Sequence, residues 1–114
     1  GVDSLSFTDR LKLETAKSIR EDYLHQNAFH EIDTFTSTTK QYLLLKMILG
    51  WHEAAIKAVG EGGSFKKITE MSAREQIGRF KYVEEAKIQE QYEAILAEMT
   101  AEFDEIVQKE AELA

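Results

Sequence analysis

A largely apolar stretch, TKQYLLLKMILGWHEAAIKAV, occupies residues Thr39–Val59. Wound as a helix, it leaves few polar positions on its circumference, and a helix of that kind is surrounded by other elements. Ser37 or Thr38 is suited to cap its start, and glycines follow its end. We therefore expect a central helix that stops at Gly60, Gly62 and Gly63. The side chains that make it apolar are Tyr42, Leu43, Leu44, Leu45, Met47, Ile48, Trp51, Ala54 and Ala55.

A second helix is predicted upstream, ending near Gln26. Ser6 followed by Asp9 is an S-x-x-D pattern, in which a side-chain oxygen and a carboxylate meet the first free backbone amides of a helix. Phe7 stands where it can pack against the first turn as a hydrophobic staple. Apolar residues then recur at spacings of three and four, which is the helical period. They are Leu13, Ala16, Ile19, Tyr23 and Leu24.

Three further helices are predicted downstream. SFKKITEM forms a short turn with Phe65, Ile68 and Met71 on one side. Ser72 with Glu75 forms a capping box that opens a short helix to about Phe80. The longest helix runs from about Glu84 to Glu110, with a single apolar stripe. The prediction is one domain over residues 1–114, an all-α compact bundle of about three long and two short helices. The stripe is Ile88, Tyr92, Ile95, Leu96, Met99, Phe103, Ile106 and Val107.

Composition and charge exclude several classes of protein. The 114 residues contain no cysteine, so disulfides and thiolate metal sites are absent. The longest apolar run, YLLLKMILGW, has ten residues and contains a lysine, which is too short to cross a membrane. The net charge is −7, and residues 84–114 alone carry ten acids and two bases. Because phosphate repels an acidic surface, nucleic acid is not an expected partner.

Two stretches resemble catalytic motifs without matching them. His30-Glu31-x-Asp33 is not the zinc motif H-E-x-x-H, because residue 34 is threonine. GEGGSFKK lacks the spacing of a phosphate-binding loop and follows a helix, whereas such a loop follows a strand. No residue is therefore assigned as catalytic or as a metal ligand. Two aromatic residues of the segment between the first helices, Phe29 and Phe35, either pack into the core or line a flat pocket.

The sequence closely resembles the C-terminal domain of the catalytic A subunit of archaeal and bacterial A/V-type rotary ATPases. The phrases DRLKLETAKSIRED, QNAFHEIDTF and KQYLLLKMI carry the resemblance, which is dense over residues 2–48. It continues through EQIGRFKYVEE and is only compositional in the last helix. The resemblance implies that the chain is part of a larger nucleotide-binding subunit in a cytoplasmic catalytic head peripheral to the membrane.

A fainter similarity to the beta subunit of F-type ATP synthases implies a contact with the rotating central stalk. The DELSEED loop of that family falls on Asp3, Ser4, Leu5, Ser6, Phe7, Thr8 and Asp9. Only Asp3 and Asp9 keep an acidic residue in this motif, so a steric push by a capped, stiff helix end fits the sequence better than charge attraction.

The same comparison places Phe29 and Phe35 where related subunits hold the adenine of ATP or ADP. A base stacked on an aromatic ring gains on the order of 1–3 kcal/mol. The remaining machinery is implied to lie upstream: a P-loop domain with its lysine, a Mg²⁺ site, a carboxylate that orients water, and an arginine from the neighbouring B subunit. The chain by itself is then expected to bind no cofactor and to hydrolyse no ATP, while domain closure in the whole subunit drives rotation.

Two other interpretations remain open on the residues alone. One is a separate acidic interaction module that binds a basic partner through Glu84–Ala114. The other is a small metal enzyme that uses His25, His30 and Asp33. Salt-sensitive binding would distinguish the first, and a metal-dependent melting temperature would distinguish the second.

Overall fold

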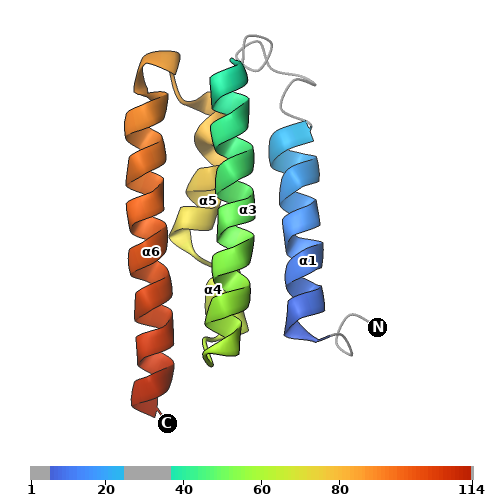
Figure 1. Ribbon diagram of the computed structural model, residues 1–114, viewed down its shortest axis with the longest axis vertical. Helices are drawn as coiled ribbons and strands as arrows, with labels where there is room; N and C mark the ends of the chain where they lie inside the picture. Colours follow the sequence, from blue (N-terminus) through green and yellow to red (C-terminus); the bar gives the residue numbers. More distant parts are fainter. Residues whose placement is uncertain (1–5, 25–36, 114) are drawn as a thin grey trace.

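The computed structural model describes residues 6–24 and 37–113, and every element in these ranges is helical (Figure 1). The elements in chain order are α1 (Phe7–Ser18) with a π-helical continuation (Ile19–Leu24), α3 (Thr38–Gly60), α4 (Phe65–Thr69), α5 (Ser72–Arg79) and α6 (Ile88–Leu113). Two 3₁₀ turns, Phe80–Tyr82 and Glu85–Lys87, join α5 to α6. The predicted all-α class, with three long and two short helices, is confirmed.

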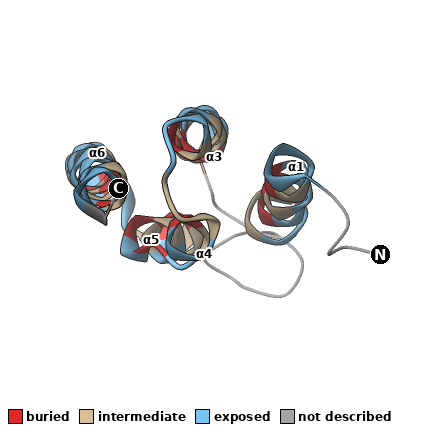
Figure 2. Cartoon of the chain, turned by 90° about the horizontal axis from the view of Figure 1, so that it is seen from below, coloured by how far each residue is buried: buried red, intermediate tan, exposed pale blue. Residues whose placement is uncertain are grey.

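Helix α3 lies at the centre, as its apolar sequence predicted. In the end-on view α1 and α6 flank it, while α4 and α5 pack across one side, and the buried residues face this common interior (Figure 2). Leu44, Met47 and Trp51 are buried in the core. Ser37 accepts the Lys40 amide at 3.0 Å, which confirms the predicted cap. At the other end Gly62 has φ +95°, a conformation for which glycine is the favoured residue.

Helix α1 meets α3 through a different face from the one that its apolar residues predicted. Leu13 is 52% exposed and Ala16 is also exposed, so these two assignments were wrong. The buried residues are Leu11, Thr15 and Ser18. Small side chains allow the two helices to approach closely, and Thr15 Oγ1 is satisfied by a 2.6 Å hydrogen bond with His52 Nδ1 of α3. Ile19 and Tyr23, in the π-helical continuation, pack against the core as predicted.

Helix α6 supplies the opposite wall of the core through its predicted apolar stripe. Ile88, Ile95 and Phe103 are buried, and Leu96 and Val107 pack against the same cluster. The α-helix itself begins at Ile88, four residues after the predicted start, because the chain first makes the 3₁₀ turn Glu85–Lys87. No helix within the described residues has the length and apolarity to cross a membrane.

The start of α5 is capped by another helix, so the predicted Ser72–Glu75 capping box was wrong. Glu102 of α6 accepts the backbone amides of Ser72 at 2.9 Å and Ala73 at 2.7 Å. The N-cap residue is Met71, whose side chain cannot accept a hydrogen bond. A carboxylate from outside the helix therefore satisfies the free amides and the helix dipole at once.

A buried lysine joins the start of α3 to the turn that follows α5. Lys40 is only 2% exposed, and its Nζ donates to the Lys81 carbonyl oxygen at 2.8 Å. A buried cation needs a hydrogen-bond acceptor, so this contact fixes the turn relative to α3.

Candidate functional site

The start of α1 forms an exposed, capped helix end at one extremity of the bundle. Ser6 Oγ accepts the Asp9 backbone amide at 3.2 Å, which confirms the predicted cap. The side chains of Ser6, Phe7, Thr8 and Asp9 are all exposed there, on one turn of helix. The other three residues predicted to contact the stalk, Asp3, Ser4 and Leu5, lie outside the described residues.

Phe7 packs on α4, so the predicted staple within its own helix was wrong. Its ring stacks on the Phe65 ring with centroids 5.2 Å apart and planes 14° apart. The Arg10 guanidinium lies over both rings, with its Cζ 4.7 Å from the Phe65 centroid and 5.9 Å from the Phe7 centroid. We call Phe7, Arg10 and Phe65 the aromatic platform. Stacking and cation–π attraction together hold the end of α1 against α4.

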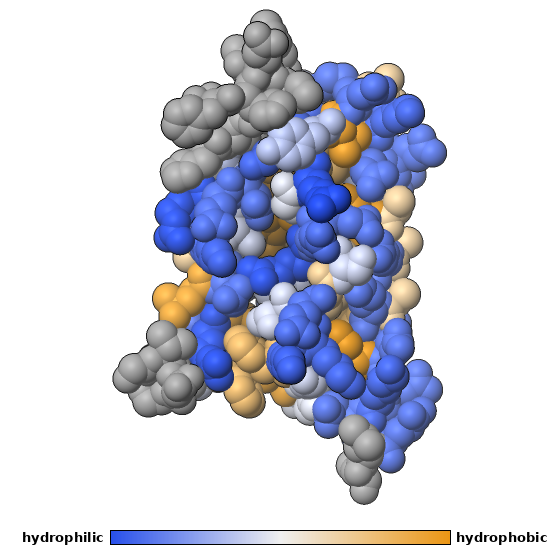
Figure 3. Space-filling view, turned by 180° about the vertical axis from the view of Figure 1, so that it is seen from behind, coloured by the Kyte–Doolittle hydropathy of each residue, from blue (hydrophilic) through white to orange (hydrophobic). Residues whose placement is uncertain are grey.

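The aromatic platform lines an open depression of about 630 Å³ at this end of the molecule. Figure 3 shows apolar surface at the lower end of the face that α4 and α5 form, surrounded by hydrophilic side chains. Lys66 of α4 and Glu110 of α6 line the same depression. The depression therefore combines flat apolar rings with charges of both signs. Phe7 is among the residues predicted to contact the stalk, whereas Phe65 is not, because α4 is distant from α1 in sequence.

The predicted nucleotide-binding residues follow the opposite end of α1. The helical continuation ends at Leu24, and α3 is capped by Ser37. Phe29 and Phe35 belong to the intervening segment and lie outside the described residues, as do His25, His30 and Asp33. Their roles therefore stay predictions.

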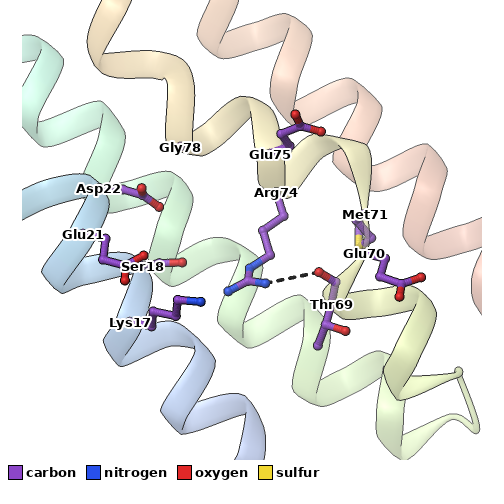
Figure 4. Close-up of a pocket in the computed structure, with 10 residues that line it drawn as sticks. All are labelled: Lys17, Ser18, Glu21, Asp22, Thr69, Glu70, Met71, Arg74, Glu75 and Gly78. Carbon is purple, nitrogen blue, oxygen red and sulfur yellow. Dashed lines mark hydrogen bonds between the residues drawn. The ribbon is translucent and has the colours of Figure 1, made fainter.

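A second cavity, of about 480 Å³, lies between α1 and the pair α4–α5 (Figure 4). Arg74 extends into it, but both of its terminal nitrogens are already engaged, whereas its buried Nε has no hydrogen-bond partner among the described residues. The guanidinium donates to the Thr69 carbonyl at 3.2 Å and pairs with the Glu14 carboxylate at 2.6 Å. It also lies 5.1 Å from the Trp51 ring centroid. Because its charge is satisfied internally, Arg74 joins helices and is not free to bind an anion.

Carboxylates outnumber cations around this second cavity. Glu21, Asp22, Glu70 and Glu75 line it, with Lys17 as the only other charged side chain besides Arg74 among its lining residues. Burial raises the pKa of Asp22, and the positive charge of Lys81 opposes that rise. No group of three or more His, Asp or Glu side chains that would suit a metal ion occurs within residues 6–24 and 37–113. The arrangement contains no nucleophile with an adjacent base.

Comparisons with known proteins identify relatives of the whole chain. Residues 1–69 match the family described as the C-terminal domain of V and A type ATP synthase. The V-type ATP synthase alpha chain of Acetivibrio thermocellus is 50% identical over 112 residues, which cover 98% of this chain and 19% of the relative. The corresponding protein of Clostridioides difficile is 47% identical over 109 residues, covering 96% of this chain and 18% of the relative.

A third relative agrees with these two. The V-type ATP synthase alpha chain of Thermoanaerobacter pseudethanolicus is 54% identical over 88 residues, which cover 77% of this chain and 15% of the relative. The matched part of the chain thus spans 15–19% of the length of these relatives. The helical bundle and the matches over most of its length lead to one conclusion. The chain belongs to the family of C-terminal domains of V- and A-type ATP synthases.

Proposed function

We propose that this domain transmits force between the nucleotide site and the central stalk of an ATP synthase, as part of the catalytic alpha chain. Nucleotide binding closes the cleft between an upstream P-loop domain and this domain, and the leading end of α1 then presses on the stalk. The reverse sequence, in which the stalk forces the cleft open, accompanies synthesis. The whole assembly includes the B subunit and works as a cytoplasmic head peripheral to the membrane.

The observation that supports this proposal is one continuous helical segment from Phe7 to Leu24, which begins at the predicted stalk contact and leads in sequence to the predicted nucleotide-binding residues. Ser6 caps the exposed start of α1, and the segment that contains Phe29 and Phe35 follows its far end at Leu24. At about 1.5 Å per residue, or slightly less in the π-helical turn, these ends are about 25 Å apart. A displacement at one end reaches the other only if the helix moves as a rigid body.

Several contacts fix α1 to the rest of the bundle. Leu11 is fully buried, Thr15 is hydrogen-bonded to His52, and Glu14 is paired with Arg74. These contacts reach α3 and α5, so bending α1 alone would break a hydrogen bond, an ion pair and apolar packing together. Packed interiors deform little, which supports rotation of the domain as a unit.

The nucleotide part of the proposal rests on the aromatic residues Phe29 and Phe35. ATP or ADP with Mg²⁺ would be bound mainly by the upstream domain, and the rings would stack on the base without taking part in phosphate chemistry. On this proposal the domain positions the nucleotide base, and the phosphate chemistry belongs to the upstream domain.

The experiment compares Phe35→Ala with Phe7→Ala in the full-length alpha chain of the assembled complex. Loss of one stacking ring is expected to weaken nucleotide binding by about 5–150-fold, which corresponds to about 1–3 kcal/mol. Phe7→Ala is the control, because it removes a ring at the other end. It is expected to keep nucleotide affinity and to lower the number of ions moved per ATP hydrolysed.

Each half of the proposal has its own contrary result. Unchanged nucleotide affinity in Phe35→Ala contradicts the assignment of the ring to the adenine site. Unchanged coupling in Phe7→Ala contradicts the contribution of the leading end to force transmission.

A further inference from the structure

We infer that the aromatic platform of Phe7, Arg10 and Phe65 docks a partner helix that presents a carboxylate beside an apolar side chain. This inference rests on the proposed function, in which the helix belongs to the central stalk. It adds α4 to the contact surface and states the chemistry that the partner must offer.

The first argument is the exposed apolar area at a position held by packing. Phe7 is 50% exposed although its ring is stacked on Phe65. Large aromatic side chains left half in water lose much of the free energy that their burial would release, and such residues are enriched at protein interfaces. The two rings are nearly parallel and are held from two helices, so they offer a pre-formed flat surface.

The second argument is the unpaired positive charge on this surface. Arg10 lies with its guanidinium over the rings, and no carboxylate within the described residues pairs with it. The Arg10 N–H groups have no hydrogen-bond acceptor within the described residues, so they are available for a planar, bidentate acceptor. Lys66, on the same depression, is also without an ion pair among those residues. Asp9 is already engaged with Lys12 at 3.7 Å.

The third argument is continuity with the predicted stalk contact. The resemblance to F-type beta subunits predicts that Ser6, Phe7 and Asp9 belong to that contact, and Phe7 is itself part of the aromatic platform. Phe65 reaches the same place from α4, which follows the central helix α3. A helix that presses on Phe7 therefore meets Phe65 and Arg10 in the same footprint. Glu110 bounds the depression on the α6 side and disfavours a carboxylate there, so the acid is directed toward Arg10 and Lys66.

The test places a photo-reactive phenylalanine analogue at position 65 of the full-length alpha chain in the assembled ATPase. Tyr42 is the matched control, because it is an exposed aromatic residue near the start of α3, whereas Phe65 follows the end of α3. We expect cross-linking to the central stalk subunit at least ten times greater from position 65 than from position 42. The analogue at Lys66, an exposed neighbour, leaves the ring stack unaltered but removes one of the two cations, so it repeats the measurement with Arg10 alone to pair the carboxylate.

The charge requirement is tested in the same experiment. The double substitution Arg10→Gln and Lys66→Gln is expected to lower the cross-linking yield from position 65 at least threefold, and higher salt is expected to lower the unsubstituted yield. A yield unaffected by the double substitution overturns the requirement for a carboxylate.

Failure of the inference can be separated from failure of the proposed function by an analogue at position 7. Cross-linking to the stalk from position 7 but not from 65 or 66 overturns the inference and leaves the proposed function intact. If none of the three positions reaches the stalk, both are overturned. Cross-linking from position 65 to a different subunit also overturns the inference.

Discussion

The guanidinium of Arg74 on α5 lies 2.6 Å from the carboxylate of Glu14 on α1, with both side chains mostly removed from water. The same guanidinium also donates to the Glu14 carbonyl oxygen at 3.4 Å and to the Thr69 carbonyl at 3.2 Å. One side chain thus connects α1, α4 and α5 while it covers the Trp51 ring of α3.

Arg74→Met is expected to lower the free energy of unfolding by about 2–4 kcal/mol, because it leaves the Glu14 carboxylate and a backbone carbonyl without their donor. The free energy of unfolding of Arg74→Lys should lie between those of the unsubstituted protein and Arg74→Met. A lysine keeps the positive charge but cannot make the several planar contacts of a guanidinium. Urea unfolding of the 114-residue chain provides the measurement. Arg79→Met is the control, because its pair with Glu75 is exposed and should change stability by no more than about 0.5 kcal/mol.

Glu102→Ala removes the carboxylate that caps α5 from α6. Two backbone amides lose their acceptor, so a loss of about 1–2 kcal/mol is expected. The amides of Ser72 and Ala73 should also exchange with solvent faster in hydrogen-exchange experiments. Glu105→Ala serves as the comparison, because Glu105 makes only an exposed pair with Lys109. Equal effects of the two substitutions would show that the cap contributes nothing particular.

Two glycines near the end of α3 should respond oppositely to alanine. A Cβ at Gly63 would lie 2.9 Å from the Ala58 carbonyl oxygen, whereas a Cβ at Gly60 meets no atom within 4 Å. Gly63→Ala is therefore expected to destabilise the domain by about 1–3 kcal/mol, because the backbone at Ala58 or at residue 63 must move to make room for the methyl group. Gly60→Ala is expected to stabilise the domain by about 0.4–1 kcal/mol, because alanine lowers the conformational entropy of the unfolded chain. Thermal unfolding of both variants checks the sign of each change.

Asp22→Asn is expected to stabilise the domain near neutral pH. Burial raises the pKa of Asp22 above its ordinary value of 3.8, so the folded state holds the proton more tightly than the unfolded state. That contribution to stability is complete below the ordinary pKa and is lost as pH rises through the raised one. The advantage of the asparagine variant should therefore grow with pH across this window. Unfolding curves from pH 3 to pH 7 measure it, and a constant difference would contradict the assignment.

The helices that the sequence located most accurately are those with an unbroken apolar period. In α6 the stripe from Ile88 to Val107 is the observed core face, and in α3 the apolar run gives the central helix. Both are decided by burial of large side chains, which local spacing encodes directly.

Predictions failed where a contact with another helix outweighed the local pattern. Leu13 was expected inside, but Thr15 is buried instead, because His52 of α3 satisfies its hydroxyl. Ser72 was predicted to cap the helix, yet the acceptor is Glu102, thirty residues later. Neither partner can be identified from the neighbouring sequence.

The candidate site was predictable only in part for the same reason. Ser6 and Asp9 are close in sequence, so their capping bond could be anticipated. The Phe7–Phe65 stack forms only because α3 brings α4 back beside the start of α1, and no pattern in the sequence near either phenylalanine predicts that contact. Arg10, three residues after Phe7, could have been noted as a neighbour on the same helix face.

The π-helical turn Ile19–Leu24 determines the direction in which the chain leaves its first helix. Such a turn accommodates an extra residue relative to an α-helical one, so every later side chain is rotated about the axis. Removing one residue from this turn would restore ordinary winding and turn Asp22 and Tyr23 to another side of the helix. Length variation at this point would therefore exchange the side chains that close this end of the bundle while α3, α5 and α6 kept their packing.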